Sequence, residues 1–383
     1  MGLDRIFNVA DARRVAKRTI PRVVFDYIDG GAEDEVTMGQ NTAAFRSLSF
    51  RPRMAAMLEA PDLATTVFGT PLSMPVILAP CGLVRLMHPD GAIGASRAAA
   101  DAGIVSVLST VAGTSPEDVA EGSSGPKWFQ LYKLGDLDAA DQLVERAKQA
   151  GYEALVVTVD TNVLGRRERD VRHGVSIPLK VGVREAMRLG PQVLARPKWA
   201  AAYVRAQAEA KREGADRRNV PEMDRSPYTW ADVEHIRANW DGPLLVKGVL
   251  TGDDARRAVQ CGAEGVVVSN HGGRQLEGAP ATVRVLPEVV EAVGSEAVVL
   301  LDGGVRRGGD VVKAVALGAQ AVLIGRAYLY GLAVAGQAGV AHVLDILRTE
   351  TARTMALMGC PSVSALDRTW IQAEPEVGKA VPS

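Results

Sequence analysis

Eight short runs of β-branched and other apolar residues recur along the chain, and they constrain its fold more than any other feature. Most of them are apolar throughout rather than alternating, which is typical of strands covered on both faces of a parallel sheet. Helical patterns rich in Ala, Arg and Asp separate the runs, and several of these patterns end in a glycine that suits a helix stop. Eight strand–helix units predict an α/β fold of the (β/α)8 TIM-barrel class. The runs lie at 76–80, 105–110, 128–132, 155–160, 244–249, 265–270, 298–304 and 322–327.

The residues outside the eight units predict a cap, an insertion and a C-terminal helix. Residues 1–75 precede the first strand, and we expect helices and a hairpin there that cap the barrel. The fourth and fifth runs are separated by far more than the roughly 30 residues of one βα unit. The surplus, at about 175–232, is expected to form an insertion on the face where barrel active sites lie. We therefore expect one domain over 1–383, with the barrel at 76–335 and a C-terminal helix and tail at 336–383.

The composition argues against several classes of protein. The 44 Lys and Arg residues balance 45 Asp and Glu residues, so there is no basic excess for binding nucleic acid. Three cysteines without a CxxC spacing argue against a disulfide framework and a metal site, and they favour a reducing, cytoplasmic location. The N-terminus lacks the apolar stretch of a signal peptide, and no uninterrupted apolar run is long enough to span a bilayer. We expect a soluble or peripheral intracellular protein.

The expected insertion is rich in basic residues, and two interpretations remain open. It could form a solvated helical lid, or it could present a basic surface to anionic lipid at the inner face of the membrane. The basic residues are Lys180, Arg184, Arg188, Arg196, Lys198, Arg205, Lys211, Arg212, Arg217 and Arg218.

Polar residues cluster at the C-terminal ends of the predicted strands, where the active sites of such barrels lie. Together they provide a candidate base, a carboxylate, several cations and a tyrosine. They are Pro80, Cys81, Gly82, Ser109, Gln130, Tyr132, Thr158, Asp160, Lys247, His271, Arg274, Asp302, Gly325 and Arg326.

The seventh and eighth strands run into glycine-rich segments at 302–310 and 324–327. Glycines let backbone N–H groups approach an anion closely, and the loops after these two strands are the usual phosphate site of a barrel. The alternative is that these glycines only form tight turns. Neither GxGxxG nor GxxxxGK[ST] occurs, so a mononucleotide or another phosphorylated ligand fits better than a Rossmann dinucleotide site or a P-loop.

The segment SNHGGRQLEG at 269–278 follows the sixth strand and carries His271 and Arg274. A histidine can act as a base near neutral pH, and an arginine can hold a carboxylate bidentately. An isolated histidine is more often structural, but the two glycines and the arginine beside this one favour a functional role.

SNHGGRQ, together with FDYIDGGAEDE, WFQLY, VDTNVLGRRERD, LVKGV and LDGGVRRGGD, closely resembles the FMN-dependent 2-hydroxy acid oxidoreductases. That family includes glycolate oxidase, L-lactate dehydrogenases and oxidases, and mandelate dehydrogenases, and the resemblance covers about 5–370. It implies a TIM barrel that binds FMN and oxidises a small (S)-2-hydroxy acid, lactate-like or mandelate-like, to the 2-oxo acid. It also implies that electrons pass to oxygen or a quinone, and that the protein is a homo-oligomer, commonly a tetramer.

The resemblance implies a role for each matched residue. His271 takes a proton from the substrate, and Asp160 stabilises the protonated histidine. Tyr132 hydrogen-bonds the region of the substrate hydroxyl, and Lys247 lies near flavin N1 and O2, where a cation favours the charge of the reduced cofactor. The substrate carboxylate is held by Tyr27 and Arg274, with Arg167 close by. The isoalloxazine is lined by Pro80, Cys81, Gly82, Ser109, Gln130, Thr158 and Ser269, and the ribityl chain and phosphate are held by Asp302, Gly304, Arg306, Gly325 and Arg326.

Several positions depart from the family pattern and leave the substrate open. Cys81 stands where the family often has threonine, and Glu277 stands where aspartate is common. Asn162 and Val163 replace a pair that usually contains proline, and Val111 replaces an aromatic residue of some members, which predicts a roomier pocket. The alternative to a hydroxy acid oxidoreductase is an FMN- or phosphate-binding TIM-barrel isomerase that carries out no net oxidation.

Overall fold

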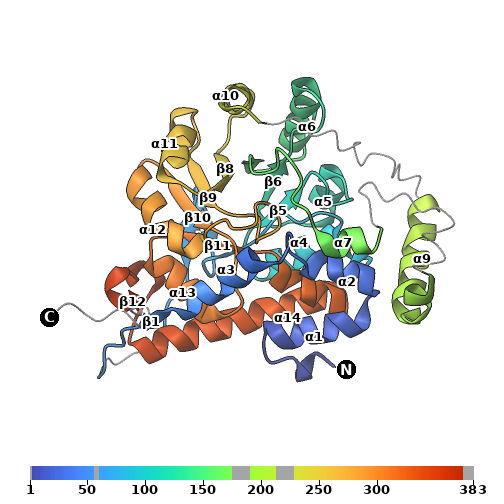
Figure 1. Ribbon diagram of the computed structural model, residues 1–383, viewed down its shortest axis with the longest axis horizontal. Helices are drawn as coiled ribbons and strands as arrows, with labels where there is room; N and C mark the ends of the chain where they lie inside the picture. Colours follow the sequence, from blue (N-terminus) through green and yellow to red (C-terminus); the bar gives the residue numbers. More distant parts are fainter. Residues whose placement is uncertain (1, 56–59, 175–189, 213–227, 374–383) are drawn as a thin grey trace.

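The computed structural model describes residues 2–55, 60–174, 190–212 and 228–373 (Figure 1). At its centre eight parallel strands close into a barrel, with helices outside it. Each strand begins within one residue of the start of a run predicted from the sequence, so the predicted (β/α)8 barrel is confirmed. The strands are β4 (Val76–Leu78), β5 (Ser106–Ser109), β6 (Lys127–Leu131), β7 (Ala154–Thr158), β8 (Leu244–Val249), β9 (Gly265–Val268), β10 (Val298–Leu301) and β11 (Ala321–Ile324).

The barrel strands are buried on both faces, which explains why their sequences do not alternate. One set of side chains fills the barrel interior, and the other packs under the surrounding helices. The helices between successive strands, and after the last one, are α4 (Gly91–Asp101), α5 (Pro116–Gly122), α6 (Leu137–Gln149), α10 (Trp230–Ala238), α11 (Gly252–Gln260), α12 (Thr282–Val293), α13 (Gly308–Ala316) and α14 (Arg326–Met358), with the short helix η2 (Val84–Leu86) before α4.

The segment before the barrel forms helices and a hairpin, as expected. The hairpin closes one end of the barrel, because its residues Val67 and Leu72 are buried in the interior cluster with Ile77 and Trp128. The elements of this segment are η1 (Leu3–Arg5), α1 (Val9–Thr19), α2 (Arg22–Asp29), α3 (Val36–Arg46), β1 (Leu48–Phe50), β2 (Thr65–Val67) and β3 (Thr70–Leu72).

The two ends of the chain meet beside the barrel. Helix α1 packs along α14, and β1 pairs antiparallel with β12 (Ile371–Ala373), which follows η3 (Val363–Ala365) and η4 (Arg368–Trp370). Figure 1 shows α1 and α14 side by side below the barrel. Helix α14 bends at Ala335 and Gly336, and Gly336 has a φ of 58°.

Helix α14 is long and apolar enough to cross a membrane by length and composition alone. Polar and charged residues interrupt its sequence, so no continuous apolar run marks it. Within its most apolar window, 61% is buried against the rest of the protein. The contacts with α1, α4 and α13 therefore identify α14 as a core helix of the fold.

Helices α7 (Glu168–Arg172) and α9 (Pro197–Arg212) lie between β7 and α10. Residues 175–189 and 213–227 of the expected insertion, with Lys180, Arg184, Arg188, Arg217 and Arg218, are outside the described residues. In α9, Trp199 stacks on Tyr203 with ring centroids 5.1 Å apart, and its indole N–H donates to the carbonyl of Leu86 at 3.0 Å. This hydrogen bond attaches α9 to the segment that follows β4.

Candidate active site

A cavity opens at the C-terminal ends of the barrel strands. Small-molecule sites of barrels commonly lie at this face. Fourteen of the residues predicted from the sequence line the cavity, namely Tyr27, Pro80, Cys81, Gly82, Tyr132, Arg167, Lys247, His271, Arg274, Asp302, Gly304, Arg306, Gly325 and Arg326. Five others lie outside this lining: Ser109, Gln130, Thr158, Asp160 and Ser269.

His271 lies on the cavity wall and is oriented by contacts on both sides of its ring. Its Nδ1 lies 3.0 and 3.2 Å from the two carboxylate oxygens of Asp160, and its Nε2 lies 3.3 Å from the Tyr132 hydroxyl. The backbone of His271 is left-handed, with φ of 58°, and its N–H donates to the Ser269 hydroxyl at 3.0 Å. This turn directs the imidazole back over the barrel mouth.

The side chains of Asp160 and His271 are mostly buried, with 13% and 18% of their surface exposed, and their ionisation follows from that burial. Burial lowers the pKa of His271 below its ordinary 6.5, and this effect outweighs the Asp160 carboxylate, which raises it. For Asp160, burial raises the pKa, but the charge and hydrogen bond of His271 and the charge of Lys247 outweigh this and lower it. The pair is therefore a carboxylate beside a neutral imidazole, the state in which a histidine can accept a proton.

Lys247 is buried at the end of β8 but keeps its charge. Its ammonium lies 3.0 Å from an Asp302 carboxylate oxygen and donates to the Ser269 hydroxyl at 2.8 Å. Burial lowers the pKa of Lys247, but the charges of Asp302 and Asp160 more than compensate and raise it above its ordinary value. A fixed positive charge therefore faces the cavity, where it can stabilise an anionic group.

Three buried polar atoms near the strand ends have no hydrogen-bond partner among the described residues: the Gln130 amide nitrogen, the Thr158 hydroxyl and one Asp302 carboxylate oxygen. The carbonyl oxygen of the Gln130 side chain accepts a hydrogen bond from the Ser109 hydroxyl at 2.7 Å, which fixes the orientation of the amide. Such groups are costly to bury unless a ligand satisfies them. Two donors and an acceptor at this position fit a flat heterocycle with its own carbonyl and N–H groups, such as the isoalloxazine of FMN.

The loop after β10 has the backbone geometry of an anion cradle. Gly303 and Gly304 have φ values of 90° and 88°, and a Cβ at Gly304 would lie 2.3 Å from the Asn41 carbonyl oxygen. Only glycine therefore fits at Gly304. Arg306 and Arg326 line the same cavity. Burial, followed by the charge of Arg274, lowers the pKa of Arg326 to about 10, so it remains cationic at neutral pH.

Two further guanidinium groups lie near His271. Arg274 donates from one nitrogen to the carbonyls of Tyr27 and Gly30, at 2.7 and 2.9 Å, and lies over the Tyr27 ring. Arg167 is partly buried, and burial followed by the charge of Arg274 lowers its pKa to about 10. Two partly buried cations that line one cavity favour an anionic ligand there.

Residues that position the site were missed in the sequence. Asn41 of α3 and Asn270 exchange two amide hydrogen bonds of 2.8 and 2.9 Å, and Gln275 donates to the carbonyls of Asp160 and Val163 at 2.8 Å each. Asn270 and Gln275 belong to the motif that drew attention to His271, so their positions gave a signal. The residues around Asn41 give no such signal, because its partner Asn270 is distant in the sequence.

One departure from the family pattern has a structural role. The Glu277 carboxylate accepts hydrogen bonds from the backbone N–H groups of Val36 and Thr37, at 2.5 and 3.3 Å, where α3 begins. A carboxylate at a helix N-terminus is favourable because it satisfies free N–H groups and faces the positive end of the helix dipole. Glu277 therefore joins the His271 loop to α3.

Comparisons with known proteins agree with this geometry. A family model described as FMN-dependent dehydrogenase matches residues 16–373. Glycolate oxidase 5 of Oryza sativa subsp. japonica is 42% identical over the whole of both chains. A peroxisomal (S)-2-hydroxyacid oxidase of Arabidopsis thaliana is 40% identical over 98% of each chain.

Solved structures show the same relationship. The crystal structure of the monotopic membrane protein (S)-mandelate dehydrogenase superposes with a TM-score of 0.88 at 37% identity, covering 97% of this chain and 100% of that one. A mandelate oxidase structure superposes with a TM-score of 0.81 at 39% identity, covering 94% and 96% of the two chains. The isomerase alternative gains no support, because these relatives are named as oxidases and dehydrogenases. The chain therefore belongs to the family of FMN-dependent dehydrogenases.

Proposed function

We propose that this protein uses FMN to oxidise a small (S)-2-hydroxy acid to the corresponding 2-oxo acid. The observation that carries the proposal is the buried carboxylate–histidine pair of Asp160 and His271 on the wall of a cavity that also holds two arginines. The oxidation removes one proton from the hydroxyl group, one hydrogen from C2, and two electrons in total. FMN, when bound, supplies the acceptor for those two electrons.

His271 is the proposed base. Its Nδ1 is engaged by Asp160, so Nε2 is the nitrogen that takes the proton. The Asp160 carboxylate stabilises the imidazolium that forms and keeps the ring in one orientation. Tyr132, whose hydroxyl lies 3.3 Å from Nε2, is the proposed hydrogen-bond partner of the substrate hydroxyl.

Arg274 and Arg167, with Tyr27, are the proposed binding site for the substrate carboxylate. Both residues line the cavity together with His271, and Arg167 is withdrawn far enough from solvent to gain from an anionic partner. When the carboxylate is bound there, the C2 atom of the acid would face the imidazole of His271.

The proposed FMN contacts form two groups, one at the flavin ring and one at the ribityl chain and phosphate. Lys247 would balance negative charge on the flavin ring, and the unpartnered Gln130 amide and Thr158 hydroxyl would donate to it. The other proposed ring contacts are Pro80, Cys81, Gly82, Ser109 and Ser269, and the proposed ribityl and phosphate contacts are Asp302, Gly304, Arg306, Gly325 and Arg326.

The proposed substrate has an apolar side chain at C2, as in L-lactate or (S)-mandelate. The support is the apolar lining that Leu83 and Val111 give the cavity beside Gly82. Val111 approaches within 3.0 Å of the point that a Cβ at Gly82 would occupy, so these two small residues together determine the free space there.

Oxygen or a quinone is the proposed electron acceptor, and the proposed setting is the cytoplasm, on the grounds that Cys81, Cys261 and Cys360 are free thiols. Contact with the inner face of a membrane is the alternative setting, supported by the exposed Leu194 and Val204 beside basic residues of the insertion. A homotetramer is proposed on the family resemblance alone.

The first prediction tests the proposed function itself. We expect the flavin absorbance of the purified holoprotein to bleach anaerobically with L-lactate, (S)-mandelate or glycolate, and air to restore it if oxygen is the acceptor. His271→Gln should retain FMN but bleach roughly 10²–10⁴-fold more slowly, because a positioned base contributes about that much. His342→Gln, which replaces a histidine bonded to the carbonyl of Ile6, is the matched control. A holoprotein that none of the three acids bleaches would contradict the proposal.

The second prediction concerns pH. Only neutral His271 accepts a proton, so kcat/KM should fall as the pH drops through the pKa of His271. Because burial lowers this pKa, the acidic limb of the pH profile should lie below the ordinary value of 6.5. In Asp160→Asn the carboxylate that raises this pKa is lost, so the limb should move to still lower pH while the maximal rate falls. Steady-state profiles of both proteins measure this. A limb that moves upward in the variant would contradict the assigned pairing.

The third prediction concerns the substrate side chain. Val111→Trp should fill the space beside Gly82 and lower kcat/KM for (S)-mandelate by about tenfold or more, while glycolate is affected less, since rejecting extra bulk is worth roughly 10–200-fold. Leu357→Trp, on the exposed surface of α14, is the control. Equal losses of kcat/KM for (S)-mandelate and glycolate would show that the C2 side chain of the substrate lies elsewhere in the cavity.

The fourth prediction concerns the unpartnered hydroxyl of Thr158. Thr158→Val should weaken FMN binding by about fivefold, the value of one hydrogen bond. The apoprotein should not lose stability, because the substitution removes a buried hydroxyl that has no partner there. Fluorescence titration with FMN and thermal unfolding measure the two effects, and Thr354→Val, whose hydroxyl is bonded within α14, serves as the control. Unchanged FMN affinity would place the hydroxyl outside the cofactor site.

A further inference from the structure

The two arginines proposed to hold the substrate carboxylate lie on different loops, and the segment at the end of α2 contacts both. The N–H of Ala32 donates to the carbonyl of Gly273, next to Arg274, at 2.8 Å. The N–H of Glu33 donates to the carbonyl of Arg166, next to Arg167, also at 2.8 Å. The segment is therefore one of the connections that set the distance between the two arginines, beside the direct contacts of Gly165 with Gln275 and of Arg167 with the Arg274 carbonyl.

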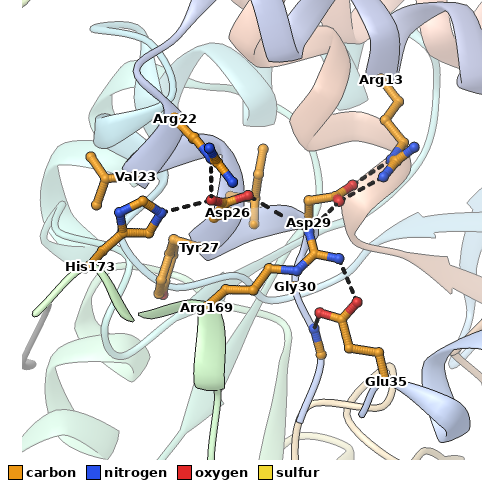
Figure 2. A network of polar contacts seen from close by, with 12 residues as sticks. Arg13, Arg22, Val23, Asp26, Tyr27, Asp29, Gly30, Glu35, Arg169 and His173 are labelled. Carbon is orange, nitrogen blue, oxygen red and sulfur yellow. Dashed lines mark hydrogen bonds and ion pairs between the residues drawn. The ribbon is translucent and has the colours of Figure 1, made fainter. Parts of the chain in front are cut away.

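A side-chain network holds the same segment to the loop of Arg167 (Figure 2). Arg169, two residues after Arg167, donates to the Asp29 carboxylate at 2.9 Å and also pairs with Glu35. The other oxygen of the Glu35 carboxylate accepts from the N–H of Gly31 at 2.9 Å. Arg169 therefore bridges two carboxylates that lie on either side of the turn after α2.

Asp29 is a fixed anchor for this bridge. Its side chain is 2% exposed and also accepts hydrogen bonds from two nitrogens of Arg13, at 2.5 and 2.8 Å, and from the Tyr330 hydroxyl at 2.8 Å. Burial raises the pKa of Asp29, but these donors and Arg169 lower it to about 2, so it is ionised throughout the neutral range. Helices α1, α2, α7 and α14 thus meet at one carboxylate.

Among the described residues, polar contacts provide the attachment of helix α7 on this side. It spans only Glu168–Arg172 and contains no buried residue. A helix without a buried apolar face gains little from packing, so polar contacts must set its position. Besides Arg169, the neighbouring His173 bonds to Asp26 of α2 at 2.7 Å, and this contact joins the same two helices.

We propose that Arg169 is a positioning residue for substrate binding: by bridging Asp29 and Glu35 it holds the loop of Arg167 at the distance from Arg274 that a carboxylate requires. The inference rests on the proposed function, because it assigns the two arginines to the substrate carboxylate. Arg169 contacts neither substrate nor cofactor in this role, and its effect is on binding rather than on the chemical step.

The test compares two arginine-to-alanine variants of the same short helix. Arg169→Ala removes the bridge. Arg172→Ala removes an exposed arginine that pairs only with Glu168 on its own helix among the described residues, so it is the matched control. Anaerobic stopped-flow bleaching of the holoenzyme by L-lactate and (S)-mandelate gives the limiting rate and the apparent substrate Kd for each protein. Hydrogen exchange of the backbone amides in 166–173 gives a readout that does not require turnover.

We expect Arg169→Ala to raise the apparent substrate Kd by about tenfold, in the range for residues that act through others, while the limiting rate and FMN content change little. Its amides in 166–173 should exchange faster than those of the wild type, and Arg172→Ala should change none of these quantities. If Arg169→Ala does not fold, Arg169→Lys replaces it, because a lysine keeps the charge but cannot bridge two carboxylates as a planar fork does. That variant should show a smaller increase in substrate Kd.

A substrate Kd that rises equally in both alanine variants, or a loss confined to the limiting rate, would overturn the inference. If no 2-hydroxy acid bleaches the wild type, the proposed function fails, and hydrogen exchange then decides about Arg169 separately. Faster exchange in Arg169→Ala alone would support its role in holding the loop, and equal exchange in both variants would reject that role.

Discussion

Closure of the sheet is the constraint on which the site depends. The pairing of β4 with β11, with Val76 opposite Val322, joins the first strand of the barrel to the last. This places the residues that follow every strand around one rim, so that groups more than a hundred residues apart, such as Asp160 and His271, come into hydrogen-bond contact. In an open sheet the same strand ends would lie along a line, and Lys247 and Cys81 could not line one cavity.

Burial of charged groups is the second physical feature that determines the properties of the site. Asp160, Lys247 and Asp302 are all withdrawn from solvent at the strand ends, and each retains its charge because an opposite charge lies close by. His271 is the exception, since burial favours its neutral form. A site with fixed charges around one titratable base can move a proton without rearranging its surroundings, which is the condition for electrostatic preorganisation.

Much of this could be predicted from the sequence. The strands were recognisable because buried parallel strands have continuous apolar runs, and His271 was recognisable from the residues around it. The contacts of α2 could not be predicted in the same way. Asp29 and Arg169 look like ordinary surface charges, and only the fold shows that Asp29 is 2% exposed and bonded to residues of three other helices. Asn41 illustrates the same limit, because its partner Asn270 is distant in the chain and an amide pair has no local pattern.

The meeting of the two ends of the chain has a consequence for how the protein is made. Arg13 from α1 and Tyr330 from α14 share the carboxylate of Asp29, and β12 pairs with β1. On a ribosome, the first helices emerge long before their partners in α14, so they must wait for nearly the whole chain to be synthesised. Helix α2 supplies Tyr27, and the carbonyls of Tyr27 and of Gly30, which follows the helix, hold Arg274. A nascent chain therefore lacks the Tyr330 contact that supports this segment until α14 is released, even when all eight strands are present.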